Sequence, residues 1–190
     1  MQTKKCQVLV IGAGPGGYVA AIRAGQLGLA TIIVEGEKAG GTCLIRGCIP
    51  SKALIHAAHQ FHKLSKHASN DGHMGISIPG PAELNMSNLV SWKEGIVTRL
   101  NKGVEHLLKN AGAELVIGWA EFQDAKTVKV GEGKDATIIQ AEHVILANGS
   151  VPIELPFMPY DENVISSREA LSLEELPKHV AIVGGGYIGL

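Results

Sequence analysis

The sequence predicts an α/β protein built around a mostly parallel sheet, and three observations lead to this fold class. An apolar, β-branched run at residues 7–11 leads through a glycine-rich turn into a stretch with helical periodicity. Further apolar runs of strand length recur at 31–34, 114–117 and 143–147. The composition, with 45% hydrophobic residues, 24 glycines and 18% charged residues, is typical of a well-buried α/β domain. Strands that alternate with helices form parallel sheets.

The first strand, turn and helix carry the spacing G-x-G-x-x-G at Gly12, Gly14 and Gly17. The first glycine permits the tight turn, the second lets the backbone approach a pyrophosphate, and the third lets the helix pack on the strand. The next strand ends in Glu35, at roughly the 20-residue distance that the dinucleotide fingerprint requires. A carboxylate there accepts hydrogen bonds from a ribose hydroxyl, which favours an unphosphorylated adenosine such as that of FAD or NAD.

Two of the three cysteines, Cys43 and Cys48, lie in the stretch 40–52. Pro50 and the apolar run after it predict a helix, so Cys48 lies near a helix N-terminus, where the thiolate form is favoured, and Lys52 adds a cation. A disulfide across so short a loop stabilises a fold little, so the pair is predicted to open and close. A structural disulfide, half a zinc site or two unrelated buried cysteines are the alternatives. The flanking glycines and the missing second pair of zinc ligands argue against them.

The middle of the chain supplies the remaining elements of the predicted sheet. Residues 66–81 read as a loop, and a long helix is expected over 87–110, capped by Ser87 and ended by Gly112. Its predicted apolar stripe consists of Leu89, Trp92, Ile96, Leu100, Val104, Leu107 and Leu108. Short alternating segments at 126–130 and 136–140 predict a β-meander that returns to the buried strand at 143–147. The histidines at 56, 59 and 62 favour a solvated helix face over a metal site.

Three prolines mark residues 150–160 as an extended linker, and a capping box at Ser166 and Glu169 begins a short helix. A strand at 180–183 then runs into a second G-x-G-x-x-G, formed by Gly184, Gly186 and Gly189. We therefore expect an FAD-binding domain at 1–150, a linker with a short helix at 151–179, and the first strand and turn of an NAD-binding domain at 180–190. The missing helix predicts that the sequence is a piece of a longer protein.

The charge pattern excludes several classes of partner. The formal net charge is -1 and no run of lysine or arginine occurs, so nucleic acid and anionic membrane surfaces are not expected partners. No apolar run approaches the ~20 residues that a membrane helix requires, and no signal peptide precedes the first strand. A cytoplasmic location follows as the expectation, and in a reducing compartment a cysteine pair is more often catalytic than structural.

Two dinucleotide fingerprints with Cys-x-x-x-x-Cys between them resemble the pyridine nucleotide-disulfide oxidoreductases, and the resemblance covers the whole chain. Residues 41–54 are most similar to members that oxidise dihydrolipoamide, while glutathione and mercuric reductases carry similar motifs. The resemblance implies an FAD/NAD(P)-binding, three-layer Rossmann-like domain of the glutathione-reductase type with a β-meander insertion. It also implies that Cys48 is the flavin-proximal thiol, forming a charge-transfer pair with the ring, and that Cys43 is the interchange thiol that exchanges with the substrate.

The resemblance further implies the cofactor-binding residues. The glycine turn and Glu35 hold the ADP part of FAD, residues 41–43 and Lys52 lie near its pyrophosphate or isoalloxazine, and Ala120 meets the adenine through its backbone. The full implied set for FAD and NAD is Gly12, Gly14, Gly17, Glu35, Gly41, Thr42, Cys43, Lys52, Ala120, Ala147, Asn148, Gly149, Gly184, Gly186 and Gly189. Ile45, Arg46 and Asn148 depart from the family pattern close to the cofactor.

The implied reaction converts dihydrolipoamide and NAD+ to lipoamide and NADH, and is expected to contribute to cell redox homeostasis. The implied partners are a lipoyl domain of a 2-oxoacid dehydrogenase or glycine cleavage complex and a second subunit in a homodimer. The histidine–glutamate base of such enzymes is not among these residues, so the 190 residues alone are expected to be inactive. Two alternatives remain: another NAD(P)H-dependent disulfide reductase, separable by NADPH preference, and a non-catalytic FAD-binding module whose cysteines only bridge.

Overall fold

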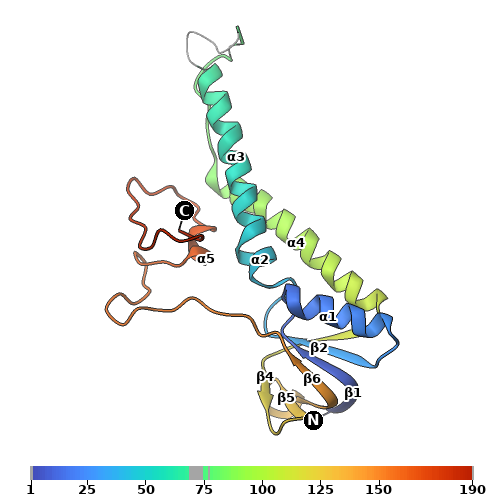
Figure 1. Cartoon of the computed structure of the whole chain (residues 1–190). Helices are drawn as coiled ribbons and strands as arrows, with labels where there is room; N and C mark the ends of the chain where they lie inside the picture. The colour runs from blue at the N-terminus through green and yellow to red at the C-terminus, as the bar shows by residue number, and fades with distance from the viewer. Residues whose placement is uncertain (1, 69–74, 77, 190) are drawn as a thin grey trace. The chain divides into compact units, whose positions relative to one another are not determined.

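The computed structural model of the 190-residue chain describes residues 2–68, 75, 76 and 78–189. The fold divides into two compact units, a sheet unit of residues 1–45 and 98–151 and a helical unit of residues 46–97 and 152–190. The boundary between them falls within α2 (Gly41–Arg46) and within α4 (Met86–Asn110). Figure 1 labels these elements along the chain.

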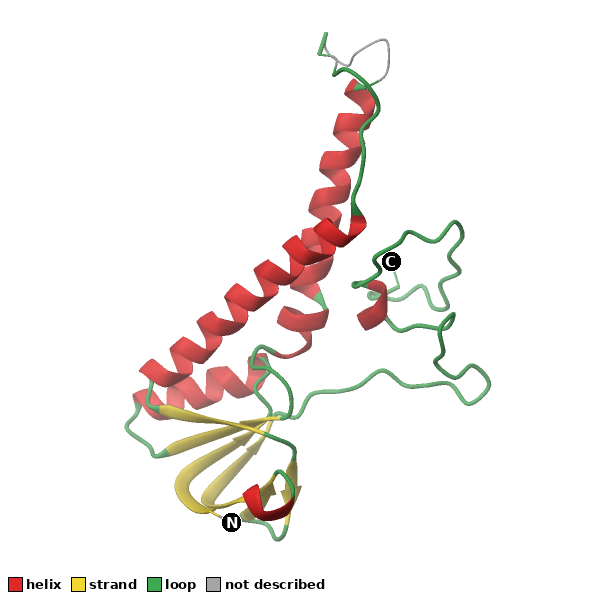
Figure 2. Cartoon of the chain, turned by 180° about the vertical axis from the view of Figure 1, so that it is seen from behind, coloured by secondary structure: helices red, strands yellow, loops and turns green. Residues whose placement is uncertain are grey.

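The sheet unit is built on a six-stranded mixed sheet, drawn in yellow in Figure 2. The strand order is β3-β2-β1-β6-β5-β4, with β1 parallel to both β2 and β6, and β2 parallel to β3. The last two strands are antiparallel to their neighbours, as a meander requires. The strands are β1 (Gln2–Ile11), β2 (Thr31–Glu35), β3 (Ala113–Ile117), β4 (Ala120–Phe122), β5 (Thr127–Val130) and β6 (Thr137–Leu146).

Among the parallel strands, β1 is buried on both faces over residues 8–10 and β2 over residues 31–34, which explains their mainly apolar sequences there. On one face Val10 and Ile33 pack with α1 (Pro15–Gln26) and with Leu108 from the C-terminal part of α4, all three side chains being fully buried. On the other face Leu9 packs with Val128 of β5 and with β6, so the sheet curls to bring the meander over the parallel strands. These two cores confirm the predicted α/β class and the β-meander. The strand predicted as buried at 143–147 is not, because Ile145 and Leu146 of β6 are exposed.

The predicted strands at 136–140 and 143–147 are a single strand, β6, which corrects the sequence analysis. Its first half pairs with β5, while its whole length pairs with β1 from Gln2↔Thr137 to Ile11↔Leu146. The same pairing extends β1 five residues before the predicted start at residue 7, although those residues are polar. Lys4 in this extension forms an ion pair with Glu114 of β3.

Helix α3 (Cys48–His67) begins two residues before Pro50, so the proline lies in the first turn, where its missing N–H leaves no helical bond unmade. The histidines at 56, 59 and 62 are all exposed on α3, which confirms the solvated face. Helix α1 begins at Pro15 and ends before Gly28, whose φ of 80° terminates it. Of the loop predicted at 66–81, residues 69–74 and 77 lie outside the described residues.

Helix α4 differs from the prediction in its cap and in its buried face. Its N-cap is Asn85, whose Oδ1 accepts a hydrogen bond from the N–H of Asn88 at 2.9 Å, and not Ser87. The buried positions are Lys93, Val97, Asn101, Val104 and Leu108, whereas Trp92, Leu100 and Leu107 of the predicted stripe are exposed.

The buried face of α4 includes two polar residues because each finds an acceptor on another segment. Within the helical unit, Lys93 Nζ donates to the carbonyl of Leu171 at 2.8 Å and to Glu94 Oε1 at 2.5 Å. Within the sheet unit, Asn101 Nδ2 donates to the carbonyl of Ala39 at 2.5 Å. Buried polar groups that are hydrogen-bonded in this way are compatible with a core.

Beyond β6 the chain is largely irregular, as the prolines predicted for 150–160. The capping box is confirmed: α5 (Ser167–Ala170) is capped by the Ser166 hydroxyl, and the Glu169 side chain accepts from the Ser166 N–H at 3.0 Å. The strand expected at 180–183 is not formed, and Val180, Ile182 and Val183 are exposed. A strand requires a hydrogen-bonded neighbour, and no described segment pairs with these residues. Among the described residues no helix combines the length and the apolar character needed to cross a membrane.

Candidate functional site

The first glycine turn lies at the carboxyl edge of the parallel strands, and its geometry excludes other residues. Gly12 has φ 97°, and a Cβ there would collide with the carbonyl oxygen of Ala147 at the end of the neighbouring β6. A Cβ on Gly17 would collide with the carbonyl oxygen of Gly12. The turn is therefore held against both the end of β6 and the first turn of α1, as the sequence pattern predicts.

The N-terminus of α1 is left open for an anion. Its N-cap is Gly14, which offers no side-chain acceptor, and Pro15 follows at the first helical position. The orphan N–H groups of the first turn and the positive end of the helix dipole together favour a phosphate group. Next to Gly14 the space is open as well, because a Cβ there would meet only Gly41 Cα, at 3.7 Å.

Glu35 lies at the end of β2, directly beside this turn. One carboxylate oxygen accepts a hydrogen bond from the N–H of Ala13 at 2.8 Å, and the other accepts from the N–H of Glu37 at 3.0 Å. These bonds fix the carboxylate in place, and its remaining lone pairs can accept from a ribose hydroxyl. The turn, the open helix N-terminus and the fixed carboxylate fit the adenosine and pyrophosphate of a dinucleotide such as FAD.

The segment before the cysteines is fastened to the same turn. The N–H of Gly40 donates to the carbonyl of Ala13 at 2.7 Å, and a Cβ on Gly41 would lie 2.5 Å from Gly14 Cα. Asn101 of α4 holds the preceding carbonyl, that of Ala39. The sequence analysis assigned no role to Asn101, since the distance in sequence to Ala39 gives no signal of their contact.

The two cysteines of the motif occupy consecutive helices. Cys43 lies in α2, and Cys48 is the first residue of α3, after Gly47 as N-cap. Both side chains are partly exposed, whereas Cys6 is buried in the sheet core. No disulfide joins any of these three cysteines, all of which the structure describes. Cys48 therefore lies at the helix N-terminus that the sequence predicts, with Lys52 exposed one turn further on.

Five more predicted residues lie in the sheet unit, four of them just after the carboxyl end of a strand and one in α2. Ala147 donates its N–H to the carbonyl of Ile11 at 2.8 Å and borders Gly12, so β6 delivers Asn148 and Gly149 to the edge where the glycine turn lies. Ala120 begins β4 just after β3 ends. Thr42 lies in α2 next to Cys43. The predicted FAD residues of the sheet unit thus gather at one edge of the sheet.

The second glycine turn repeats the internal geometry of the first. Gly184 has φ 106°, close to the 97° of Gly12, and a Cβ on Gly189 would collide with the carbonyl oxygen of Gly184. The N–H of Gly189 donates to the carbonyl of Gly186 at 3.1 Å. The turn belongs to the helical unit, and it forms without a strand before it. Its conformation is therefore specified locally.

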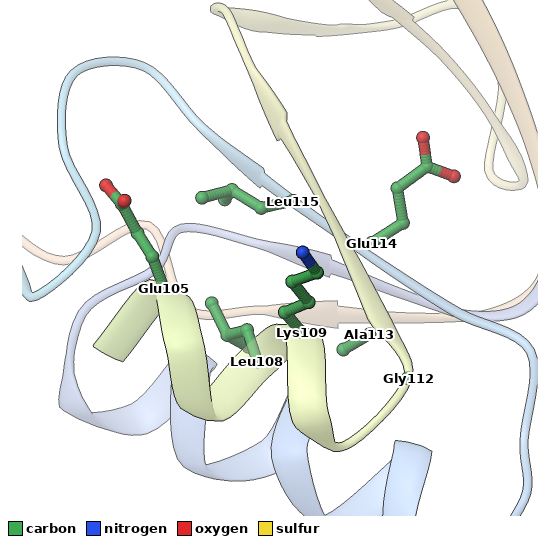
Figure 3. Close-up of a pocket in the computed structure, with 7 residues that line it drawn as sticks. All are labelled: Glu105, Leu108, Lys109, Gly112, Ala113, Glu114 and Leu115. Carbon is green, nitrogen blue, oxygen red and sulfur yellow. The ribbon is translucent and has the colours of Figure 1, made fainter. Parts of the chain in front are cut away.

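The pocket shown in Figure 3 lies away from these residues. It has a volume of about 410 Å³ and lies between the C-terminal turn of α4 and the start of β3, at the amino edge of that strand. It is lined by Glu105, Leu108, Lys109, Gly112, Ala113, Glu114 and Leu115, none of which belongs to the predicted site. Over the described part of the chain, no three His, Cys, Asp or Glu side chains are grouped so that they could hold a metal ion.

The chain belongs to the pyridine nucleotide-disulphide oxidoreductases, whose family model matches residues 6–190. Proteins of this family use FAD and NAD. Among its curated relatives, the dihydrolipoyl dehydrogenase of Pseudomonas aeruginosa is 51% identical over 190 residues, and that of Geobacillus stearothermophilus is 46% identical over 184. These alignments cover 100% and 97% of this chain but only 40% and 38% of the relatives.

Solved structures support the same family. The HOCl-induced flavoprotein disulfide reductase RclA from Escherichia coli superposes with a TM-score of 0.77 at 28% identity, over 96% of this chain and 38% of that one. LpdA from Mycobacterium tuberculosis shares the fold, with a TM-score of 0.78 at 22% identity over 91% of this chain and 38% of that one. The chain thus spans about two fifths of the length of the proteins that it matches.

Proposed function

We propose that this chain is the FAD-binding part of a flavoprotein that oxidises dihydrolipoamide with NAD+ through a Cys43–Cys48 redox pair. The observation that carries the proposal is the position of Cys48, the first residue of a 20-residue helix that only Gly47 separates from the helix containing Cys43. The dihydrolipoyl dehydrogenases among its relatives favour this substrate over those of other disulfide reductases.

FAD would be held by the carboxyl edge of the sheet. The first-turn N–H groups of α1 would bind its pyrophosphate, and Glu35 would accept from the adenosine ribose. By family resemblance, the backbone of Ala120 would meet the adenine, residues 41–43 and Lys52 would lie near the pyrophosphate or flavin, and residues 147–149 would border the flavin. When bound, FAD supplies two-electron transfer between the thiol pair and NAD+.

The cysteines themselves carry the exchange with substrate. With the pair in its disulfide form, one thiolate of dihydrolipoamide attacks Cys43 Sγ and releases Cys48 as a thiolate. The second substrate thiolate then attacks the substrate sulfur of the mixed disulfide, which closes the ring of lipoamide and releases the Cys43 thiolate. The substrate loses two electrons to the cysteine pair, and its two thiol protons pass to solvent. The N-terminus of α3 favours the anion at Cys48, which makes it the better leaving group.

The remaining assignments concern the larger protein. Residues 1–150 would form the first segment of an FAD domain, 151–179 the linker, and 180–190 the start of an NAD domain, in which the second glycine turn would hold the NAD pyrophosphate. In that domain a neighbouring strand would supply the hydrogen bonds that residues 180–183 need to form a strand. The proposed partners are a lipoyl domain of a multienzyme complex and a second subunit, in the cytoplasm.

The thiol pair can be tested without the cofactor. In glutathione buffers of increasing oxidising strength, peptide mass spectrometry is expected to show a reversible Cys43–Cys48 disulfide, while Cys6 stays a thiol because it is buried in the core. A disulfide that includes Cys6, or no link between Cys43 and Cys48, contradicts the assignment of the pair.

The whole reaction is tested by an absorbance titration of the full-length protein with dithionite, NADH and lipoamide. The proposal predicts a long-wavelength band on two-electron reduction, loss of the band in Cys48→Ser, and its retention in the control Cys6→Ala. Reoxidation by lipoamide supports this substrate, whereas reoxidation only by glutathione disulfide or mercuric ion assigns the protein to another reductase. Direct bleaching of the flavin without the band leaves the non-catalytic module as the better description.

A further inference from the structure

A large aromatic side chain, Trp119, lies beside the carboxylate that the dinucleotide fingerprint uses. Trp119 follows β3 and is 75% exposed. The benzenoid part of its indole lies against Gly36, the residue directly after Glu35. No function was predicted for Trp119, and most of its side-chain surface is exposed.

The backbone on both sides of the indole is fixed. The N–H of Gly118 donates to the carbonyl of Glu35 at 2.8 Å, and the carbonyl of Trp119 accepts from the N–H of Gly131 at 3.1 Å. Gly118 has φ 151°, and a Cβ there would lie 2.8 Å from Val130 Cγ1. The chain therefore leaves β3 through a glycine that places Trp119 level with the end of β2.

The backbone conformation of Gly36 does not itself require a glycine, but the indole lies where a Cβ would stand. The φ of Gly36 lies outside the left-handed region, so other residues could adopt the same conformation. A Cβ at this position, however, would lie 2.9 Å from both Cδ2 and Cε2 of Trp119 and 3.1 Å from Cζ2. Such distances are too short for carbon atoms, so a side chain at residue 36 would displace the ring.

We propose that Trp119 is the stacking surface for the adenine ring of the bound dinucleotide, an inference that rests on the proposed function. A ribose bonded to Glu35 would carry its phosphate toward the glycine turn. Its base would then extend away from the turn, on the side where Gly36 follows Glu35. An exposed indole held beside that path offers a π-face to a purine base. Trp119 is then a positioning residue that selects an adenine nucleotide and takes no part in electron transfer.

The chain suits a fluorescence test because it has two tryptophans, so replacing Trp92 leaves Trp119 as the single source of tryptophan emission. In a Trp92→Phe background, ADP added to the chain is expected to quench Trp119 emission and to protect it from acrylamide. FAD and ADP affinities are measured in parallel by equilibrium dialysis, and circular dichroism verifies that every variant is folded.

Trp119→Ala is expected to weaken ADP and FAD binding about tenfold, which corresponds to ~1.4 kcal/mol. Trp119→Phe should lose less than this because it retains an aromatic face. Gly36→Ala, which displaces the indole without removing it, should also weaken binding. The matched control is Phe122→Ala, which removes another exposed aromatic ring from the same unit and should leave both affinities unchanged.

Failure of this inference and failure of the proposed function give different results. If the parent chain binds FAD and ADP but Trp119 emission and acrylamide access do not respond, the stacking role is wrong and the dinucleotide site stands. If Trp119→Ala and the parent chain bind ADP and FAD with equal affinity, the stacking role of Trp119 is wrong as well. If the folded parent chain binds neither nucleotide, the proposed function fails and this inference fails with it.

Discussion

Replacing Asn101 by leucine tests how α4 supports the segment that leads into the cysteine motif. The Asn101 side chain is 8% exposed, and its Nδ2 donates to the carbonyl of the fully buried Ala39. Leucine has a similar size but no donor, so the change removes the hydrogen bond without opening a large cavity. The neighbouring Gly40 is bonded to Ala13 of the glycine turn, so the perturbation lies one residue from the cofactor site.

The expected loss is about 2 kcal/mol in the free energy of unfolding of the sheet unit. A net hydrogen bond contributes about 1 kcal/mol, and a buried acceptor left without its donor costs a further ~1 kcal/mol or more. With a urea m-value of about 2 kcal/mol per M, the unfolding midpoint should fall by about 1 M. The affinity for ADP should fall as well, because the segment beside the glycine turn loses a support.

The assay is urea unfolding followed by Trp119 fluorescence in the Trp92→Phe background, since Trp119 and Asn101 belong to the same unit. The matched control is Asn110→Leu, an exposed asparagine at the end of the same helix, which should leave the midpoint nearly unchanged. A loss below about 0.5 kcal/mol, equal to that of the control, would refute the argument that this bond carries a buried acceptor.

Three further predictions follow from the geometry. Gly17→Ala should abolish FAD binding measured by equilibrium dialysis, since the added Cβ collides with the Gly12 carbonyl, whereas the same change at exposed Gly103 should not. Burial raises the pKa of the Cys6 thiol above 9.0, so iodoacetamide should label Cys6 after the other two cysteines, and early labelling would contradict this. The stability that the protonated thiol contributes should be lost as the pH rises above 9.0 toward the raised pKa. The hydrogen bond from the Ser166 hydroxyl lowers the pKa of Glu169, so the capping box should persist at neutral pH and be lost only as the pH falls through that lowered pKa. NMR titration of the Glu169 carboxyl in the wild type and in Ser166→Ala measures this difference in pKa.

The sequence predicts the strands and turns of the sheet well where the signal lies in residues that are adjacent in the sequence. The runs at 7–11 and 31–34 are mainly apolar because each is covered on both faces, and the glycines that follow can be assigned from local geometry alone. The same reason explains the second glycine turn, which adopts the φ angle of the first although no strand precedes it. Local sequence is sufficient for such turns.

The failures of prediction involve partners that lie far away in the sequence. The stripe predicted on α4 includes Trp92 and omits Lys93, yet Trp92 is exposed and the lysine is buried, where Leu171 supplies an acceptor. The strand pairing of residues 2–6 is equally distant, since their partners begin at Thr137. In the site, Trp119 was missed because only the structure places it beside Gly36. Periodicity contains no information on these contacts.

The pairing of β1 with β6 also constrains the order in which the protein can form during synthesis. β1 leaves the ribosome before the other strands of this sheet, but the neighbour on one side of it is β6, which ends at Leu146. Pairing β1 with β6 closes a loop of about 135 residues. The chain loses the entropy of closing that loop before the strand contacts can stabilise it, so the pairing forms slowly. The nascent chain must therefore keep an apolar strand partly uncovered until most of the sheet unit has been translated. During that interval β1 and β2 are the segments most exposed to misassembly or to capture by a chaperone.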